Sequence, residues 1–157
     1  MDGKHVELIN RIIGKDAGIK TFRDRLIIQK MTYLLKSAGF APDYFYSWYV
    51  RGPYSIGLSN DARNYYGTGQ TSSVAITEKE TDVVNRLRSF LSDDLRDLDR
   101  LDLKLELYGS LLFLHDERKL DINSSELVSL LKYLKPWFNL EEIQAAADKM
   151  KGSGLFN

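Results

Sequence analysis

The chain has 157 residues, of which 43% are hydrophobic and 11% aromatic, and this is enough apolar material for the core of a single domain over residues 1–157. It contains no cysteine, which excludes disulfides, thiolate metal sites and a cysteine nucleophile. The 22 basic and 22 acidic residues give a net charge of zero, whereas a dedicated nucleic-acid binder is usually basic. The N-terminus lacks the apolar region of a signal peptide, and no apolar run reaches the roughly 20 residues that span a bilayer. We therefore expect a cytoplasmic protein with no membrane segment.

Two helices are predicted at the start of the chain. Apolar residues at helical spacing predict the first over residues 5–15. Thr21 and Asp24 form a capping-box pattern, in which each side chain bonds the other residue's backbone N–H, and this pattern opens the second helix. Gly39 is a natural residue to end that helix, because glycine adopts the left-handed conformation at little cost.

A strand is predicted next. Residues 45–50 are aromatic or β-branched apart from Ser47, and such side chains favour a strand. We expect Gly52-Pro53 to end it, because proline cannot donate to a ladder, and Ser55 to cap a following helix. A short segment at residues 74–76 is a candidate antiparallel partner for this strand.

The C-terminal half predicts helices only. A second capping-box pattern begins at Thr77, and residues 101–115 form the longest apolar-periodic stretch, which suits a central helix. Ser124 or Ser125 starts the next helix, and Asn139 caps the last. The sequence therefore predicts a mainly α (α+β) fold of about seven helices with a small two-stranded antiparallel β element, distantly winged-helix-like in its N-terminal half.

Two stretches of the chain resemble a known family. Residues 28–35 read Ile-Gln-Lys-Met-Thr-Tyr-Leu-Leu, and the aromatic segment 44–55 ends in Arg-Gly-Pro-Tyr-Ser. These patterns are similar to the SocA-like, or Panacea, antitoxin domains, and most similar to their prokaryotic YwgA-like branch. That branch has a Leu-Gln-Lys-Leu-hydrophobic-Tyr-Leu helix, an aromatic segment and a Tyr-Gly-Pro-Tyr/Val turn. Arg51 replaces the usual aromatic residue before the glycine, and residues 135–143 resemble the way the branch ends.

The resemblance implies a protein without enzymatic activity. Members of the wider superfamily bind a partner protein as antitoxins or as proteolytic adaptors, whereas the YwgA-like branch brings no assigned activity with it. We therefore expect an antitoxin or regulatory adaptor whose partner is a protein, such as a toxin or a component of a protease system. A homodimer through Trp137-Phe138 or Leu155-Phe156 is an alternative, since either pair can also pack on its own domain.

The aromatic segment is the candidate partner-binding surface. Tyrosine and tryptophan suit interfaces because they bury a large area at low entropic cost. The predicted partner-binding residues are Tyr46, Trp48, Arg51, Gly52, Pro53, Tyr54 and Ser55. In the alternative interpretation the inward face of the strand is core, since side chains alternate along a strand, and Arg51 is a surface residue or pairs within the chain.

The second helix offers a different hypothesis. Arg23, Arg25 and Lys30 could contact phosphates while Gln29 contacts a base edge, as in a winged-helix-like DNA-binding regulator. Residues 1–70 support this mildly, with 10 Lys/Arg against 6 Asp/Glu. The plainer interpretation is that these four residues are the solvated side of an amphipathic helix.

No motif indicates a cofactor, a metal or catalysis. The chain has neither Gly-rich nucleotide motif, and the aspartates between residues 93 and 102 lack the spacing of a calcium loop. His115 is followed by two acidic residues at a predicted helix end, where consecutive side chains point apart instead of converging on a ligand.

Overall fold

A computed structural model describes residues 3–40, 44–68 and 75–156 of the chain. Within these ranges the chain forms seven α-helices, two short 3₁₀-helices and one antiparallel hairpin, which confirms the predicted mainly α fold with a small β element. In chain order the elements are α1 (Lys4–Ile13), α2 (Phe22–Ser37), β1 (Ser47–Tyr49), β2 (Gly52–Tyr54), α3 (Ile56–Gly67), α4 (Glu78–Phe90), η1 (Asp94–Arg96), η2 (Leu98–Arg100), α5 (Leu101–Arg118), α6 (Ser125–Leu134) and α7 (Leu140–Ser153).

Several helices begin at the capping residues that were identified from the sequence. Thr21 and Asp24 form a complete capping box at α2, with Thr21 accepting from the Asp24 backbone N–H and Asp24 accepting from the Thr21 N–H. Thr77 caps α4 and Asn139 caps α7 in the same reciprocal way. Ser55 caps α3 through its side chain, so this helix starts directly after the hairpin.

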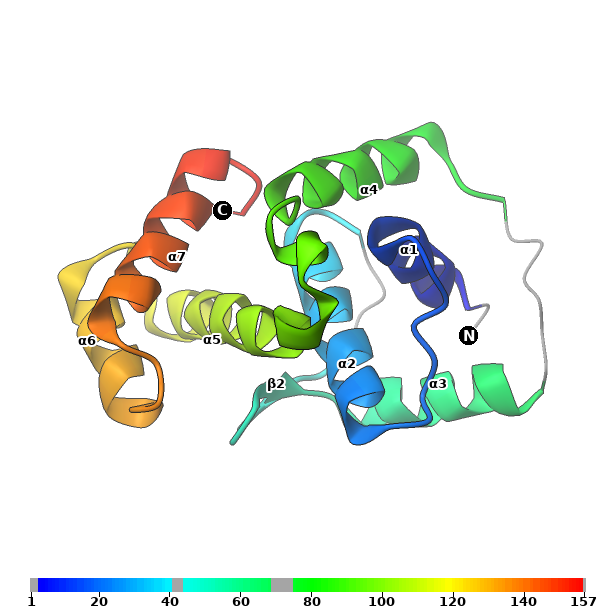
Figure 1. Cartoon of the computed structure of the whole chain (residues 1–157), viewed down its shortest axis with the longest axis horizontal. Helices are drawn as coiled ribbons and strands as arrows, with labels where there is room; N and C mark the ends of the chain where they lie inside the picture. The colour runs from blue at the N-terminus through cyan, green and yellow to red at the C-terminus, as the bar shows by residue number, and fades with distance from the viewer. Residues whose placement is uncertain (1–2, 41–43, 69–74, 157) are drawn as a thin grey trace.

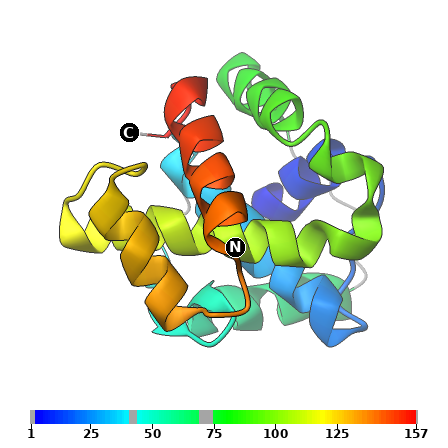
Figure 2. The same cartoon turned by 60° about the vertical axis from the view of Figure 1, so that its left-hand side comes forward.

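The central helix is α5, as the sequence predicted. Every residue from 105 to 112 is buried, so this helix is covered on all sides instead of showing one apolar face. It contacts α2, α6, α7 and β2. In Figure 1, α6 and α7 gather on one side of the molecule and α1, α3 and α4 on the other, and Figure 2 shows α5 running between the two groups. The buried apolar side chains form one continuous cluster across both groups.

The hairpin differs from the prediction. Strand β1 pairs with β2 in the register Ser47–Tyr54, Trp48–Pro53 and Tyr49–Gly52, so the Gly-Pro pair continues the β element instead of ending it. Both strands of such a ribbon are edges, where proline is tolerated. Residues 75 and 76 belong to no strand, and Val74 lies outside the described residues. A two-residue turn brings the observed strands together at a smaller loss of chain entropy than a connection of about two dozen residues.

Gly52 allows the hairpin to lie directly on α5. Its φ of +102° belongs to the region that favours glycine, and a Cβ added there meets Ser110 Oγ at 3.1 Å and Lys30 Cε at 3.4 Å. The hairpin is therefore held close to α2 and α5 by the absence of a side chain at this position.

We predict that Gly52→Ala lowers the free energy of unfolding by about 1–3 kcal/mol, because the new methyl group adds backbone strain and crowds two side chains. Urea denaturation followed by circular dichroism measures the change. Gly152→Ala is the control, since nothing lies within 4 Å of its Cβ position in α7. We expect that control to be neutral or slightly stabilising, and equal effects at the two positions would contradict the close packing of Gly52.

Candidate functional site

Two buried residues of α2, Gln29 and Lys30, attach the helix to the backbone at the end of the hairpin. The Gln29 amide donates to the Ser55 carbonyl O and accepts from the Ser55 backbone N–H, both at 2.8 Å. The Lys30 ammonium Nζ donates to the Pro53 carbonyl O at 2.7 Å. Both side chains are buried, so the prediction that Gln29 and Lys30 lie on a solvated or DNA-facing side of the helix is wrong. Buried polar groups need hydrogen-bond partners, and the hairpin backbone supplies them.

The other two residues of the predicted DNA-contact set, Arg23 and Arg25, lie closer to the start of α2. Arg23 Nε lies 3.1 Å from Asp102 Oδ1, and Arg25 Nη1 donates to the Ile19 carbonyl O at 2.9 Å. The four residues predicted as one contact surface are therefore divided between the core, an ion pair with α5 and a local contact before α2.

A single buried carboxylate, that of Glu106 on α5, joins three segments of the chain. Its side chain is 3% exposed. Glu106 Oε2 accepts from Lys135 Nζ at 3.3 Å and from the Trp137 indole Nε1 at 3.1 Å. Its other oxygen lies 3.8 Å from Arg51 Nη1 at the hairpin turn. The carboxylate thus connects α5 to the hairpin and to the α6–α7 connection, the arrangement that a buried charge requires.

Lys135, at the end of α6, also connects Glu106 to the hairpin. It is buried, and its ammonium also donates to the Val50 carbonyl O in the hairpin turn. The ammonium lies 4.9 Å from the centre of the Trp48 ring and 5.3 Å from that of Trp137, both within cation–π range. Two aromatic residues separated by almost ninety positions in the sequence are in this way fixed around one cation.

The pKa values of the two buried lysines are lowered. Burial is the main cause of the lowering of the Lys30 pKa to about 7, because removal from water disfavours the charged ammonium. The positive charge of Lys135 lowers the Lys30 pKa further, and the negative charge of Glu106 opposes the shift. Burial also lowers the pKa of Lys135, against the raising effect of Glu106.

Above this buried network lies an exposed surface, which we call the hairpin-tip surface and define as Tyr49, Val50, Arg51 and Trp137. The exposed fractions of Tyr49, Val50 and Trp137 are 47%, 73% and 51%, and that of the Arg51 side chain is 48%. Leu134 and Leu140, near Trp137 in the sequence, are exposed as well. Large apolar side chains that remain in water beside an arginine are typical of a contact surface.

The structure separates the residues predicted to bind a partner. Arg51 is exposed, and Trp48 and Tyr54 are half-buried, whereas the remaining four are buried: Tyr46, Gly52, Pro53 and Ser55. Gly52, Pro53 and Ser55 belong to the support of the turn, whereas Tyr46 precedes β1 and packs edge to face on Tyr33. The prediction did not include Tyr49 and Val50, although the turn between Tyr49 and Gly52 leaves Val50 and Arg51 at its tip.

The candidates for self-association also separate. Trp137 is half-exposed, but Phe138, Leu155 and Phe156 are buried in the core. The Phe156 ring lies 5.3 Å from that of Phe90 at the end of α4. The C-terminal pair therefore packs on its own chain.

No protein-family model, curated protein or solved structure matches this chain.

In the described parts of the chain, no three acidic or histidine side chains lie together as a metal would require. His115 contacts the Leu120 carbonyl O through Nδ1 at 2.5 Å. None of the helices in those parts is both long enough and apolar enough to cross a bilayer.

We predict that Glu106→Gln lowers the free energy of unfolding by about 3–5 kcal/mol, because it leaves the buried Lys135 ammonium without its counter-charge. Chemical denaturation measures the effect. The matched control is Asp121→Asn, which breaks an ion pair with Lys151 whose side chains are both more than half exposed. Exposed pairs contribute about 0–1 kcal/mol, so similar losses in the two variants would contradict the central role of Glu106.

We also predict a pH dependence of stability that originates at Lys30. Its pKa is about 7 in the folded protein against an ordinary 10.5, so between these values the unfolded chain binds more protons than the folded one. Stability therefore rises with pH through this window, by up to about 1.4 kcal/mol per pH unit from this group, and that gain is lost as pH falls to 7.

Urea denaturation at half-unit intervals from pH 6 to pH 10 tests this assignment. Lys30→Met should make the rise shallower, because one titrating group is gone, while Lys135, whose pKa burial also lowers, still contributes. Gln29→Met disturbs the same attachment of the hairpin without removing a titratable group and should keep the wild-type slope. An unchanged slope in Lys30→Met would assign the pH dependence to other groups.

Proposed function

We propose that this protein is a non-enzymatic partner-binding module, an antitoxin or a regulatory adaptor, that recognises another protein through the hairpin-tip surface. The observation that carries the proposal is the exposure of Tyr49, Val50 and Trp137 around Arg51, above a buried network that holds the Val50 carbonyl and the Trp137 indole. The resemblance of residues 28–35 and 44–55 to SocA-like and YwgA-like domains supports the same class of function.

Rigidity of the surface favours binding. The Val50 carbonyl is held by Lys135, and the Trp137 indole is held by Glu106, so these groups do not need to be ordered when a partner arrives. Ordering a side chain on association costs about 0.5–1.5 kcal/mol, and a surface fixed in advance avoids part of this loss.

The chemistry of the surface indicates a partner that presents an apolar side chain beside a carboxylate. Arg51 is about half exposed and lies 3.8 Å from Glu106, a longer separation than the 3.3 Å between Lys135 and the same carboxylate. Its guanidinium therefore has donors left for a carboxylate from outside, in the paired geometry that arginine favours. Tyr49, Val50 and Trp137 supply the apolar contact area around it.

The alternative, a DNA-binding regulator, keeps fewer of its predicted contacts. Gln29 and Lys30 are buried, and Arg23 pairs with Asp102, so α2 does not present the four residues together. DNA binding predicts an affinity that falls steeply with salt as phosphate contacts release counterions. A homodimer through Trp137 is a further alternative, which size-exclusion chromatography with light scattering distinguishes from a different partner.

The proposal predicts a specific crosslink from the hairpin tip. A photoreactive amino acid in place of Val50 should give, in cells of the native host, a protein adduct of defined mass that survives nuclease treatment. Arg51→Glu should reduce that adduct at least about tenfold, equivalent to a loss of about 1.4 kcal/mol in binding. The matched control is Arg11→Glu on α1, whose arginine is equally exposed in an ion pair with Glu7, and it should leave the adduct unchanged.

Two outcomes would contradict this function. One is an adduct that forms equally from a photoreactive residue at Phe22, which is also exposed but lies outside the hairpin-tip surface. The other is an adduct that Arg51→Glu does not affect. An adduct that disappears with nuclease would favour the DNA-binding alternative.

A further inference from the structure

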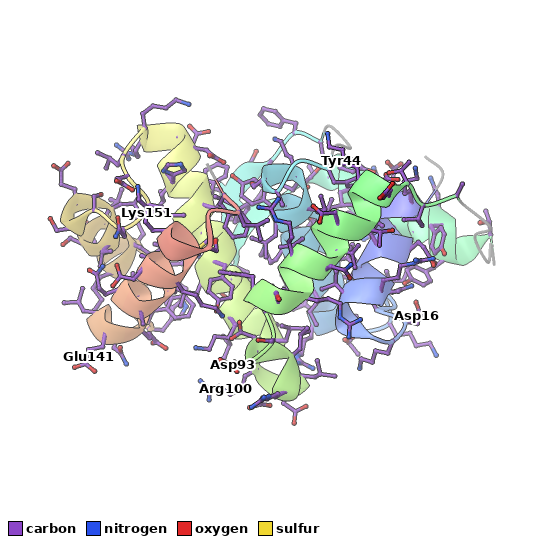
Figure 3. The ribbon with its side chains drawn as sticks, turned by 90° about the horizontal axis from the view of Figure 1, so that it is seen from above. Asp16, Tyr44, Asp93, Arg100, Glu141 and Lys151 are labelled. Carbon is purple, nitrogen blue, oxygen red and sulfur yellow. The ribbon has the colours of Figure 1, made fainter. Side chains whose placement is uncertain are left out.

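A separate aromatic pocket lies where the chain enters the hairpin. A cavity of about 430 Å³ opens between the C-terminal ends of α2 and α5 and the residues that precede β1. The rings of Tyr33, Tyr46 and Phe113 line it, and so does Phe45, whose exposed fraction is 86%. This volume suits a small organic group. Tyr44 also lines the pocket, and in Figure 3 it lies far from Glu141 at the start of α7, so the pocket is distant from that end of the molecule.

The aromatic wall is rigid and uncharged. The Tyr33 and Tyr46 rings meet edge to face at 4.9 Å, and Phe113 lies 6.2 Å from Tyr33. Burial raises the pKa of both tyrosines well above the ordinary value, and for Tyr33 the negative charge of Asp116 adds to the effect. Both phenols therefore stay neutral, and their ring faces keep the partial negative charge that attracts cations.

The rim of the pocket carries an excess of negative charge. Asp116 and Glu117 lie at the end of α5, and Asp116 Oδ2 accepts from the Tyr33 hydroxyl at 2.8 Å, which fixes its position. Lys36 is the one basic residue among the described residues that line the pocket, and its ammonium lies 5.4 Å from the centre of the Tyr46 ring. The protein's own cation thus already lies over the face of one aromatic wall, with two carboxylates nearby.

We propose that this pocket binds the guanidinium group of an organic cation, which takes the place of the Lys36 ammonium over the Tyr46 ring. A planar guanidinium stacks on aromatic faces and pairs with carboxylates, and Asp116 and Glu117 provide that pairing at the rim. The Tyr46 hydroxyl itself is buried, so the contact that this residue offers a ligand is its ring face, over which the Lys36 ammonium lies. The proposal does not depend on the function assigned to the hairpin-tip surface.

Nuclear magnetic resonance titration of the full chain tests the pocket, because it detects weak binding and locates it. The probe is acetyl-arginine methylamide, and its neutral counterpart is acetyl-citrulline methylamide, which has nearly the same shape. We expect the arginine probe to shift signals of Tyr33, Tyr46 and Phe113, and the citrulline probe to shift them at least about tenfold more weakly, because it lacks the charge. Propylguanidinium forms a second arm: equal affinity indicates a free small cation, and weaker affinity indicates an arginine side chain of a peptide.

Variants with opposite expected effects make the outcome decisive. Lys36→Gln should strengthen binding about three- to tenfold by removing the internal competitor, and Asp116→Asn should weaken it by a similar factor. Asp82→Asn, on the exposed side of α4 and outside the pocket, is the matched control and should have no effect. Equal binding of the arginine and citrulline probes, or no binding of the arginine probe even to Lys36→Gln, would overturn the proposal.

Discussion

The ion pair between Glu106 and Lys135 is the interaction on which the arrangement of the surface depends. It joins the middle of α5 to the connection between α6 and α7, and both partners reach the hairpin, Glu106 through Arg51 and Lys135 through the Val50 carbonyl. Charges removed from water are tolerated only when further hydrogen bonds complete their shells. The Trp137 indole and the hairpin backbone supply these bonds, so the requirements of two buried charges fix the geometry of an exposed surface.

The residues that carry the resemblance to the SocA-like domains have a structural role in this molecule. Gln29 and Lys30 attach the hairpin through the Ser55 and Pro53 backbone, and Gly52 allows the hairpin to approach α5. The Gln-Lys pair on α2 and the Gly-Pro pair in β2 therefore depend on each other. The backbone at Pro53 and Ser55 supplies hydrogen-bond partners for the two buried side chains, and Gly52 leaves room for Lys30. The exposed residues of the hairpin-tip surface lie beside these residues, at the tip of the turn and on the α6–α7 connection.

Local features of the fold were predictable from the sequence, whereas long-range contacts were not. The capping boxes at Thr21 and Thr77 and the cap at Ser55 were identified correctly because capping depends on residues three positions apart. The burial of Lys30 was missed, since helical spacing alone does not reveal a partner carbonyl 23 positions away. The same holds for Trp137, whose contact with Glu106 spans 31 positions and appears in no local pattern. The predicted strand pairing is wrong because a two-residue turn competes with any distant partner, and Gly52-Pro53 continues the β element that it was predicted to end.

A double-mutant cycle between Glu106 and Lys135 tests the central interaction most directly. The free energy of unfolding is measured for the wild type, Glu106→Gln, Lys135→Met and the double variant. Two partners in one buried network should give a coupling energy of about 2–3 kcal/mol, with the double variant less destabilised than the sum of the single variants. Additive effects, within about 0.5 kcal/mol, would show that the two residues act independently and would contradict their role in fixing the hairpin-tip surface.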